Sequence, residues 1–146
     1  MAQAAAGLSF AAALVHGSVM ASHFREYWLF GLFFAILTPL QLAWAELVRR
    51  RPADRLWLAV GAAGNFGVVM IWTVSRTFGL PFGPERFEPE ALGVKDVLAT
   101  IDELGIALLV SLLLLRGGGR PAPTWVVGAA WTAVAVSVPA AMVAGH

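Results

Sequence analysis

Long apolar segments follow one another along this chain of 146 residues, and they constrain its fold more than any other feature. A helix needs about 20 mostly apolar residues to cross the hydrocarbon core of a bilayer. Four segments have this character, at about 24–48, 56–77, 94–116 and 123–144, and a weaker, alanine-rich segment covers 2–20. The sequence therefore predicts an all-α integral membrane bundle of five transmembrane helices, in one domain of residues 1–146.

The first segment, Ala2–Met20, allows two interpretations. It is either a retained helix or a signal peptide cleaved near Ala21, in which case the bundle has four helices. Signal peptides begin with a positively charged region, whereas the first residues of this segment contain no Lys or Arg. We therefore expect a retained helix.

Composition indicates which solvent and which partners the chain has. Hydrophobic residues make up 59% of it and charged residues 13%, about half the usual share for a soluble domain. The lipid bilayer is thus the expected partner, with a second copy or another membrane subunit as further candidates. A net charge of +1 gives no indication of nucleic-acid binding. Because cysteine is absent, disulfides and thiolate metal sites are excluded.

Arginine placement predicts the orientation. The turn after the second helix reads RRRPADR and the turn before the fifth reads RGGGRPAP. Two spans separate these turns, so they lie on one side, and Lys and Arg favour the cytoplasmic side. We expect a multi-pass protein of the cell (plasma, inner) membrane with its N-terminus in the cytoplasm and its C-terminus outside. Residues 79–93 then form an outer loop.

The fourth helix carries acidic residues below that outer loop. Glu103 lies about 13 Å along the helix, where a carboxylate is costly in lipid and should face the bundle interior. Asp96 shares its face, seven residues earlier. We predict that Arg76, at the end of the third helix, pairs with Glu103 or Asp96. Asp102 falls on the face of Lys95, and pairing between these two is one interpretation.

Two histidines, His16 and His23, flank the predicted break between the first two helices. Together with Glu26 they form a candidate metal site, because imidazole and carboxylate suit zinc, iron or copper. The spacing matches no HExxH motif, so ordinary interfacial histidines are the alternative. A candidate ligand-binding pocket beneath the loop combines further polar side chains: Tyr27, Gln41, Arg76, Glu90, Asp96 and Glu103.

Several of these residues fall in one extended pattern. It consists of His16, HFREYWLFGLFFAILTPLQ at 23–41, SRTFGLPFGP at 75–84, EPEALGVKD at 88–96, and Glu103. The pattern resembles a group of small multipass membrane proteins of high-GC bacteria. The resemblance implies a multipass fold and carries no activity over. It groups these residues together: His16, His23, Gln41, Arg76, Gly83, Pro84, Glu90, Asp96 and Glu103.

Three functional hypotheses follow. The first is a protein that binds a metal ion or a small polar ligand in an outer pocket. The second is a structural or assembly subunit of a larger membrane complex, in which the same residues form an internal salt-bridge network. The third is a small transporter that uses Glu103 or Asp96 as a proton-coupled carboxylate, although no inverted repeat is visible. The sequence carries no GxSxG, GxGxxG or P-loop motif, and whether the protein is an enzyme stays open.

Overall fold

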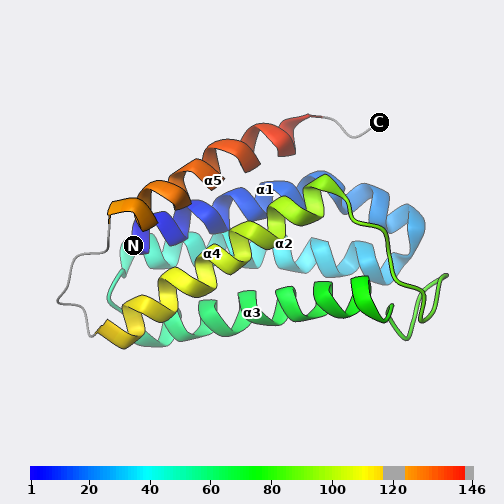
Figure 1. The fold of residues 1–146 in the computed structure, drawn as a ribbon, viewed down its shortest axis with the longest axis horizontal. Helices are drawn as coiled ribbons and strands as arrows, with labels where there is room; N and C mark the ends of the chain where they lie inside the picture. The colour runs from blue at the N-terminus through cyan, green and yellow to red at the C-terminus, as the bar shows by residue number, and fades with distance from the viewer. Residues whose placement is uncertain (117–123, 144–146) are drawn as a thin grey trace.

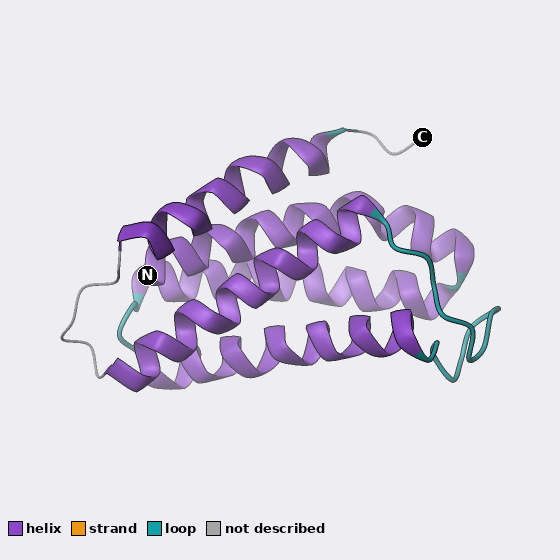
Figure 2. Cartoon of the chain, viewed as in Figure 1, coloured by secondary structure: helices purple, strands orange, loops and turns teal. Residues whose placement is uncertain are grey.

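The computed structural model describes residues 1–116 and 124–143, and these residues form five α-helices and no strand (Figures 1 and 2). All five helices are long and apolar enough to cross a membrane. The predicted all-α bundle of five spans is therefore confirmed. The helices are α1 (Ala2–Glu26), α2 (Trp28–Arg50), α3 (Arg55–Thr77), α4 (Val94–Arg116) and α5 (Thr124–Met142).

The first helix ends later than the sequence predicted. A single extended residue, Tyr27 (φ −157°, ψ 128°), separates α1 from α2. No glycine or proline lies between Met20 and Trp28 to mark this break. The prediction that the histidines flank the break is therefore wrong, because His16 and His23 both lie on α1. The α3 and α4 bounds agree to within one residue, and the predicted ends of the fifth helix, 123 and 144, lie outside the described residues.

The alanine-rich helix α1 is the most buried of the five. It packs against α2, α4 and α5, and Ala5, Ala11 and Ala12 are fully buried. Small side chains let helix backbones approach closely in a membrane. At Gly105 of α4 a Cβ atom would lie 2.8 Å from the Leu8 side chain, so a larger residue there would push the two helices apart. The helix with the weaker apolar character in the sequence, α1, therefore lies at the centre of the bundle.

The packed core lies at the end of the bundle that holds the arginine-rich turn. Leu8, Val48, Leu58, Ile106 and Val110 come from four different helices and are almost fully buried there.

At this same end α2 joins α3. The Trp44 indole Nε1 donates to the carbonyl of Trp57 (2.7 Å), and its ring occupies the space that a side chain at Gly61 would need. The Asp54 carboxylate accepts from the backbone amides of Leu56 (3.1 Å) and Trp57 (3.4 Å), which caps the start of α3. The contacts of Trp44 with Trp57 and Gly61 fix α2 to α3 at this end.

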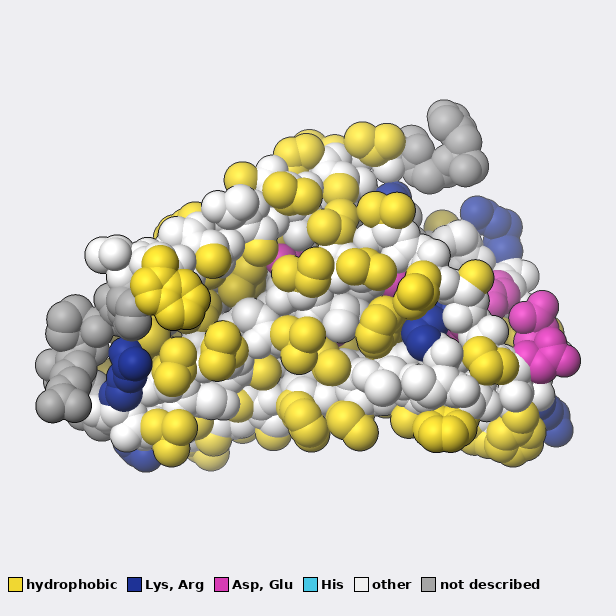
Figure 3. All heavy atoms as spheres, viewed as in Figure 1, with side chains coloured by type: hydrophobic (Ala, Val, Ile, Leu, Met, Phe, Trp, Pro, Cys, Tyr) yellow, Lys and Arg dark blue, Asp and Glu magenta, His cyan; other side chains and the backbone are white. Residues whose placement is uncertain are grey.

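The surface is apolar along the length of the helices. Large side chains such as Phe10, Ile36, Phe66, Met70 and Leu108 are exposed, and in Figure 3 hydrophobic side chains are spread over the middle of the visible face, while most charged side chains lie toward the two ends. Soluble proteins rarely expose apolar patches of this kind, so lipid is the fitting environment. The α2–α3 turn and the end of α4 lie at one end of the bundle, and the loop 79–93 lies at the other (Figure 1). Arg120, used in the orientation argument, is outside the described residues.

Candidate functional site

A cavity of about 450 Å³ lies at the loop end of the bundle, between α1, α2, α3 and α4. Its walls are mostly apolar, and its polar side chains come from three helices and the loop. The apolar walls include Val15, Val19, Phe30, Phe33, Phe34, Val68, Ile71, Trp72, Leu80 and Phe82. The polar lining consists of His16, His23, Ser75, Arg76, Glu90, Lys95, Asp96, Thr100 and Glu103. The packed core and the cavity therefore occupy opposite ends of the bundle.

The loop 79–93 covers this cavity. Leu80, Phe82 and Glu90 belong to its lining, and the Phe82 ring lies 6.1 Å from the ring of Phe30 on α2. The Glu90 backbone amide donates to the carbonyl of Ser75 (3.0 Å), which ties the loop to α3. Gly79 has φ +71°, and a Cβ there would collide with the backbone of Glu88, so the turn requires glycine. The loop is thus a folded cap.

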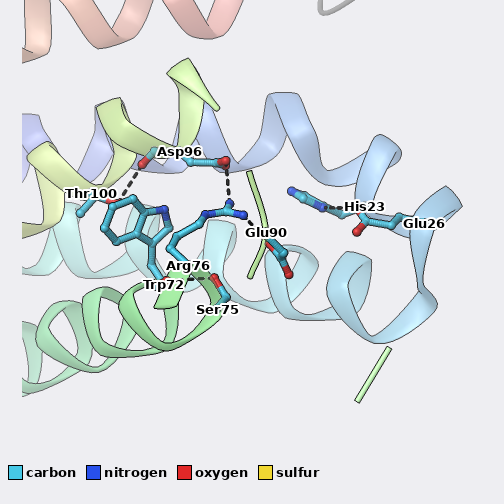
Figure 4. A network of polar contacts seen from close by, with 8 residues as sticks. All are labelled: His23, Glu26, Trp72, Ser75, Arg76, Glu90, Asp96 and Thr100. Carbon is cyan, nitrogen blue, oxygen red and sulfur yellow. Dashed lines mark hydrogen bonds and ion pairs between the residues drawn. The ribbon is translucent and has the colours of Figure 1, made fainter. Parts of the chain in front are cut away.

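Arg76 joins three parts of the site (Figure 4). Its Nη1 donates to Glu90 Oε2 (2.6 Å) and its Nη2 to Asp96 Oδ2 (2.8 Å). The arginine side chain is 11% exposed. Of the two predicted partners, Asp96 is found and Glu103 is not. The ion pairs connect α3 to the start of α4 and to the loop. Several polar residues of the cavity lining lie at this end.

Glu103 pairs with a histidine instead. Its Oε1 lies 2.9 Å from His16 Nε2 and accepts from Gln41 Nε2 (3.4 Å), and the residue is 1% exposed. Arg76 contacts Asp96, and Glu103 lies about 10 Å further along α4, so one guanidinium does not serve both carboxylates. His16 reaches Glu103 because α1 packs directly against α4. The floor of the cavity is therefore a buried imidazole–carboxyl pair.

The two histidines do not converge on one point. The ring of Phe34 contacts both, at centroid distances of 5.2 Å from His16 and 4.6 Å from His23. His23 Nδ1 lies 3.2 Å from Glu26 Oε2, near the surface. The predicted metal set of His16, His23 and Glu26 is thus divided between two pairs. Within residues 1–116 and 124–143, no group of three His, Asp or Glu side chains is placed to hold a metal ion.

Asp102 faces away from the cavity. It is fully buried and lies near Ser137 of α5, yet neither carboxylate oxygen nor the serine hydroxyl has a hydrogen-bond partner in the described part of the chain. Lys95 donates to Ser18 Oγ (3.2 Å). The predicted pairing of Asp102 with Lys95 is therefore not found.

Six of the nine predicted site residues line the cavity: His16, His23, Arg76, Glu90, Asp96 and Glu103. The other three do not. Gln41 lies behind Glu103, Glu26 is exposed beside His23, and Tyr27 forms the α1–α2 break with its ring 5.3 Å from Phe30.

Sequence reasoning did not identify the aromatic residues as walls of a cavity. Trp72 lies one helical turn before Arg76, and Phe34 lies two turns before Gln41, so helical spacing from a predicted polar residue places part of this set on the polar faces. Exposed aromatic residues such as Phe66 occur on the same helices. Residue type alone does not separate cavity lining from lipid-facing surface.

Comparisons of the chain with protein-family models, with curated proteins and with solved structures gave no match. The site offers a partly open apolar space, a few polar groups in its lining, and a folded loop beside it. This arrangement can bind a small molecule and can exchange a proton with it at His16 and Glu103.

Proposed function

We propose that this protein binds a small amphipathic molecule inside the membrane bundle, beneath the loop 79–93. One observation carries the proposal: a cavity of about 450 Å³ with apolar walls and a few convergent polar groups. Ligand sites in proteins typically measure about 300–1,000 Å³ and have this composition.

The charges around the cavity favour an uncharged or weakly charged ligand. Arg76 is balanced by Glu90 and Asp96, and Glu103 has His16 as its partner. A ligand therefore meets hydrogen-bonding groups more than uncompensated charge. Its apolar part would lie against the phenylalanine rings of α2.

The bilayer is the natural source of such a ligand. Ile71 of α3 lines the cavity and is 47% exposed. Helices α2 and α3 are joined at the arginine-rich end by Trp44 and Trp57. We infer that the ligand enters between the unjoined parts of α2 and α3, past Ile71.

The experiment compares what the purified protein carries in two variants. Ala99 lines the cavity and is buried, so Ala99→Leu fills part of the space. Ala63 is exposed on α3, and Ala63→Leu makes the same change outside the cavity. Organic extracts of detergent-purified protein are analysed by mass spectrometry. We expect one amphipathic compound in the parent and in Ala63→Leu, at about one molecule per chain, and its loss from Ala99→Leu.

The same samples separate this proposal from the alternatives. Identical extracts from the parent and Ala99→Leu contradict it. Stoichiometric zinc, iron or copper that disappears in His16→Ala would support the metal hypothesis instead. Co-purification of another membrane chain that depends on the Arg76 pairs would support the assembly subunit.

A transporter also has one specific observation in its favour. Asp102 and Glu103 are adjacent carboxyl groups, both almost fully buried in a membrane helix. Such groups commonly mark proton pathways. Proton uptake by liposomes that depends on Glu103, with no extracted ligand, would favour this third hypothesis.

A further inference from the structure

A second hollow lies on the outside of the bundle, at the arginine-rich end. It is a groove of about 460 Å³ lined by residues of α1, α2 and α5. Trp131 of α5 forms one side, and a Cβ atom at Gly7 of α1 would lie 3.0 Å from its ring, so these two helices meet closely there. The groove shares no lining residue with the cavity beneath the loop, so it is a separate site.

The groove changes from polar to apolar along its length. The Gln3 side chain donates to the carbonyl of Arg49 (3.4 Å), which places the start of α1 beside the end of α2. Seven residues deeper in each helix, about 10 Å at 1.5 Å per residue, the lining residues are Phe10 on α1 and Leu42 on α2. Polar groups therefore lie at the end of the bundle and apolar groups toward its middle. A phospholipid has the same order of headgroup and acyl chain.

The charges at the polar end favour an anion. Among the described residues that line the groove, Glu46 is the only acidic one. Two arginines bind its carboxylate, Arg49 through Nε (2.6 Å) and Nη2 (2.7 Å) and Arg50 through Nε. Two guanidinium groups on one carboxylate leave one net positive charge, and their remaining N–H groups are free to bind a phosphate, which arginine recognises through several N–H groups at once.

The deeper part of the groove suits an acyl chain. Phe10 and Trp131 line it and are 48% and 47% exposed, so the groove is open at the surface of the bundle. Leu42 and Val134 add to its apolar walls. A bilayer brings acyl chains to every such surface, so the charge at the polar end decides which headgroup binds best.

We propose that this groove binds one anionic phospholipid, with its phosphate at Arg49 and an acyl chain along Phe10 and Leu42. The phosphate accepts hydrogen bonds from Arg49 Nη1 and from Arg50, and Glu46 holds the two guanidinium groups together. Basic pockets between transmembrane helices bind anionic headgroups in this way. The proposal goes beyond the ligand of the cavity and does not depend on it.

Other occupants fit the groove less well. A zwitterionic headgroup brings no net charge to offset that of the arginines. A second copy of the chain has the same orientation in the membrane, so its own arginine-rich turn would lie at the same depth as this one. Like charges would then meet across the interface, which is unfavourable.

Native mass spectrometry of the detergent-purified protein measures the selectivity. The protein is titrated with palmitoyl-oleoyl phosphatidylglycerol and, in parallel, with palmitoyl-oleoyl phosphatidylcholine, which has the same chains and no net charge. We expect saturable binding of one phosphatidylglycerol per chain, about tenfold tighter than that of phosphatidylcholine, because hydrogen bonds between charged groups distinguish the two.

Two pairs of variants test the two ends of the groove. Arg49→Gln should weaken phosphatidylglycerol binding about fivefold and leave phosphatidylcholine binding unchanged. Arg55→Gln makes the same change at an exposed position of α3 outside the groove and should affect neither lipid. Val134→Phe fills the apolar part and should weaken both lipids, whereas Val136→Phe, on the exposed surface of α5, should weaken neither.

Three results overturn the proposal. The first is equal affinity of the parent protein for the two lipids. The second is an equal loss in Arg49→Gln and Arg55→Gln, since the charge of the whole turn would then select the lipid. The third is a dimer that binds neither lipid and dissociates in Val134→Phe, which assigns the groove to a second copy. Should Val134→Phe fail to fold, the arginine pair still decides. None of these results changes the Ala99→Leu test of the cavity.

Discussion

Removal of the Arg76 side chain should destabilise the bundle by an amount that the geometry allows us to estimate. The guanidinium makes two charge-assisted hydrogen bonds, of 2.6 Å to Glu90 and 2.8 Å to Asp96. Removing one member of a buried ion pair typically costs about 3–5 kcal/mol. The partner carboxylates are 26% and 22% exposed, so water can partly replace the arginine. We therefore expect the lower end of that range, about 3 kcal/mol, for Arg76→Ala.

A double-mutant cycle measures whether the pairing is the cause. Reversible unfolding in mixed micelles is followed by circular dichroism as the fraction of sodium dodecyl sulfate increases. Asp96→Asn combined with Arg76→Ala should recover part of the lost stability, because one of the two carboxylates left without a partner is gone. Arg86→Ala, on the exposed part of the loop, is the matched control and should stay within about 0.5 kcal/mol of the parent. An Arg76→Ala protein that unfolds like the Arg86→Ala control would refute the reasoning.

Two further predictions test the joined end of the bundle and its orientation. Gly61→Ala should lower the free energy of unfolding by about 1–3 kcal/mol, because the new methyl group meets the Trp44 ring. The control Gly64→Ala has open space around it and should not lower this free energy. Equal unfolding curves in sodium dodecyl sulfate would contradict the close α2–α3 contact. If the arginine-rich turn is cytoplasmic, a cysteine at Ala53 should resist an impermeant thiol reagent in intact cells and a cysteine at Arg86 should react, and the reverse pattern would place the cavity at the cytoplasmic face.

The sequence by itself determined the class and the span count. Apolar segments of membrane-crossing length leave few alternatives, because every backbone polar group in lipid must be satisfied within a helix. It also grouped polar residues that the structure brings together around one cavity. Helical phase set Asp96 and Glu103 on one face, and the cost of a charge in lipid required that face to point inward.

The tertiary structure alone decided which polar groups meet. Whether Arg76 or His16 reaches Glu103 depends on which helices touch, and α1 packs on α4 because its alanines permit a close approach. The sequence does not indicate that contact. It also does not indicate that α1 ends only before Tyr27, so that both histidines lie on one helix. The aromatic lining of the cavity could not be predicted from the sequence for a related reason. In a membrane protein apolar side chains face both the lipid and the interior, so hydropathy does not tell Phe33, in the cavity, from Phe66, at the surface.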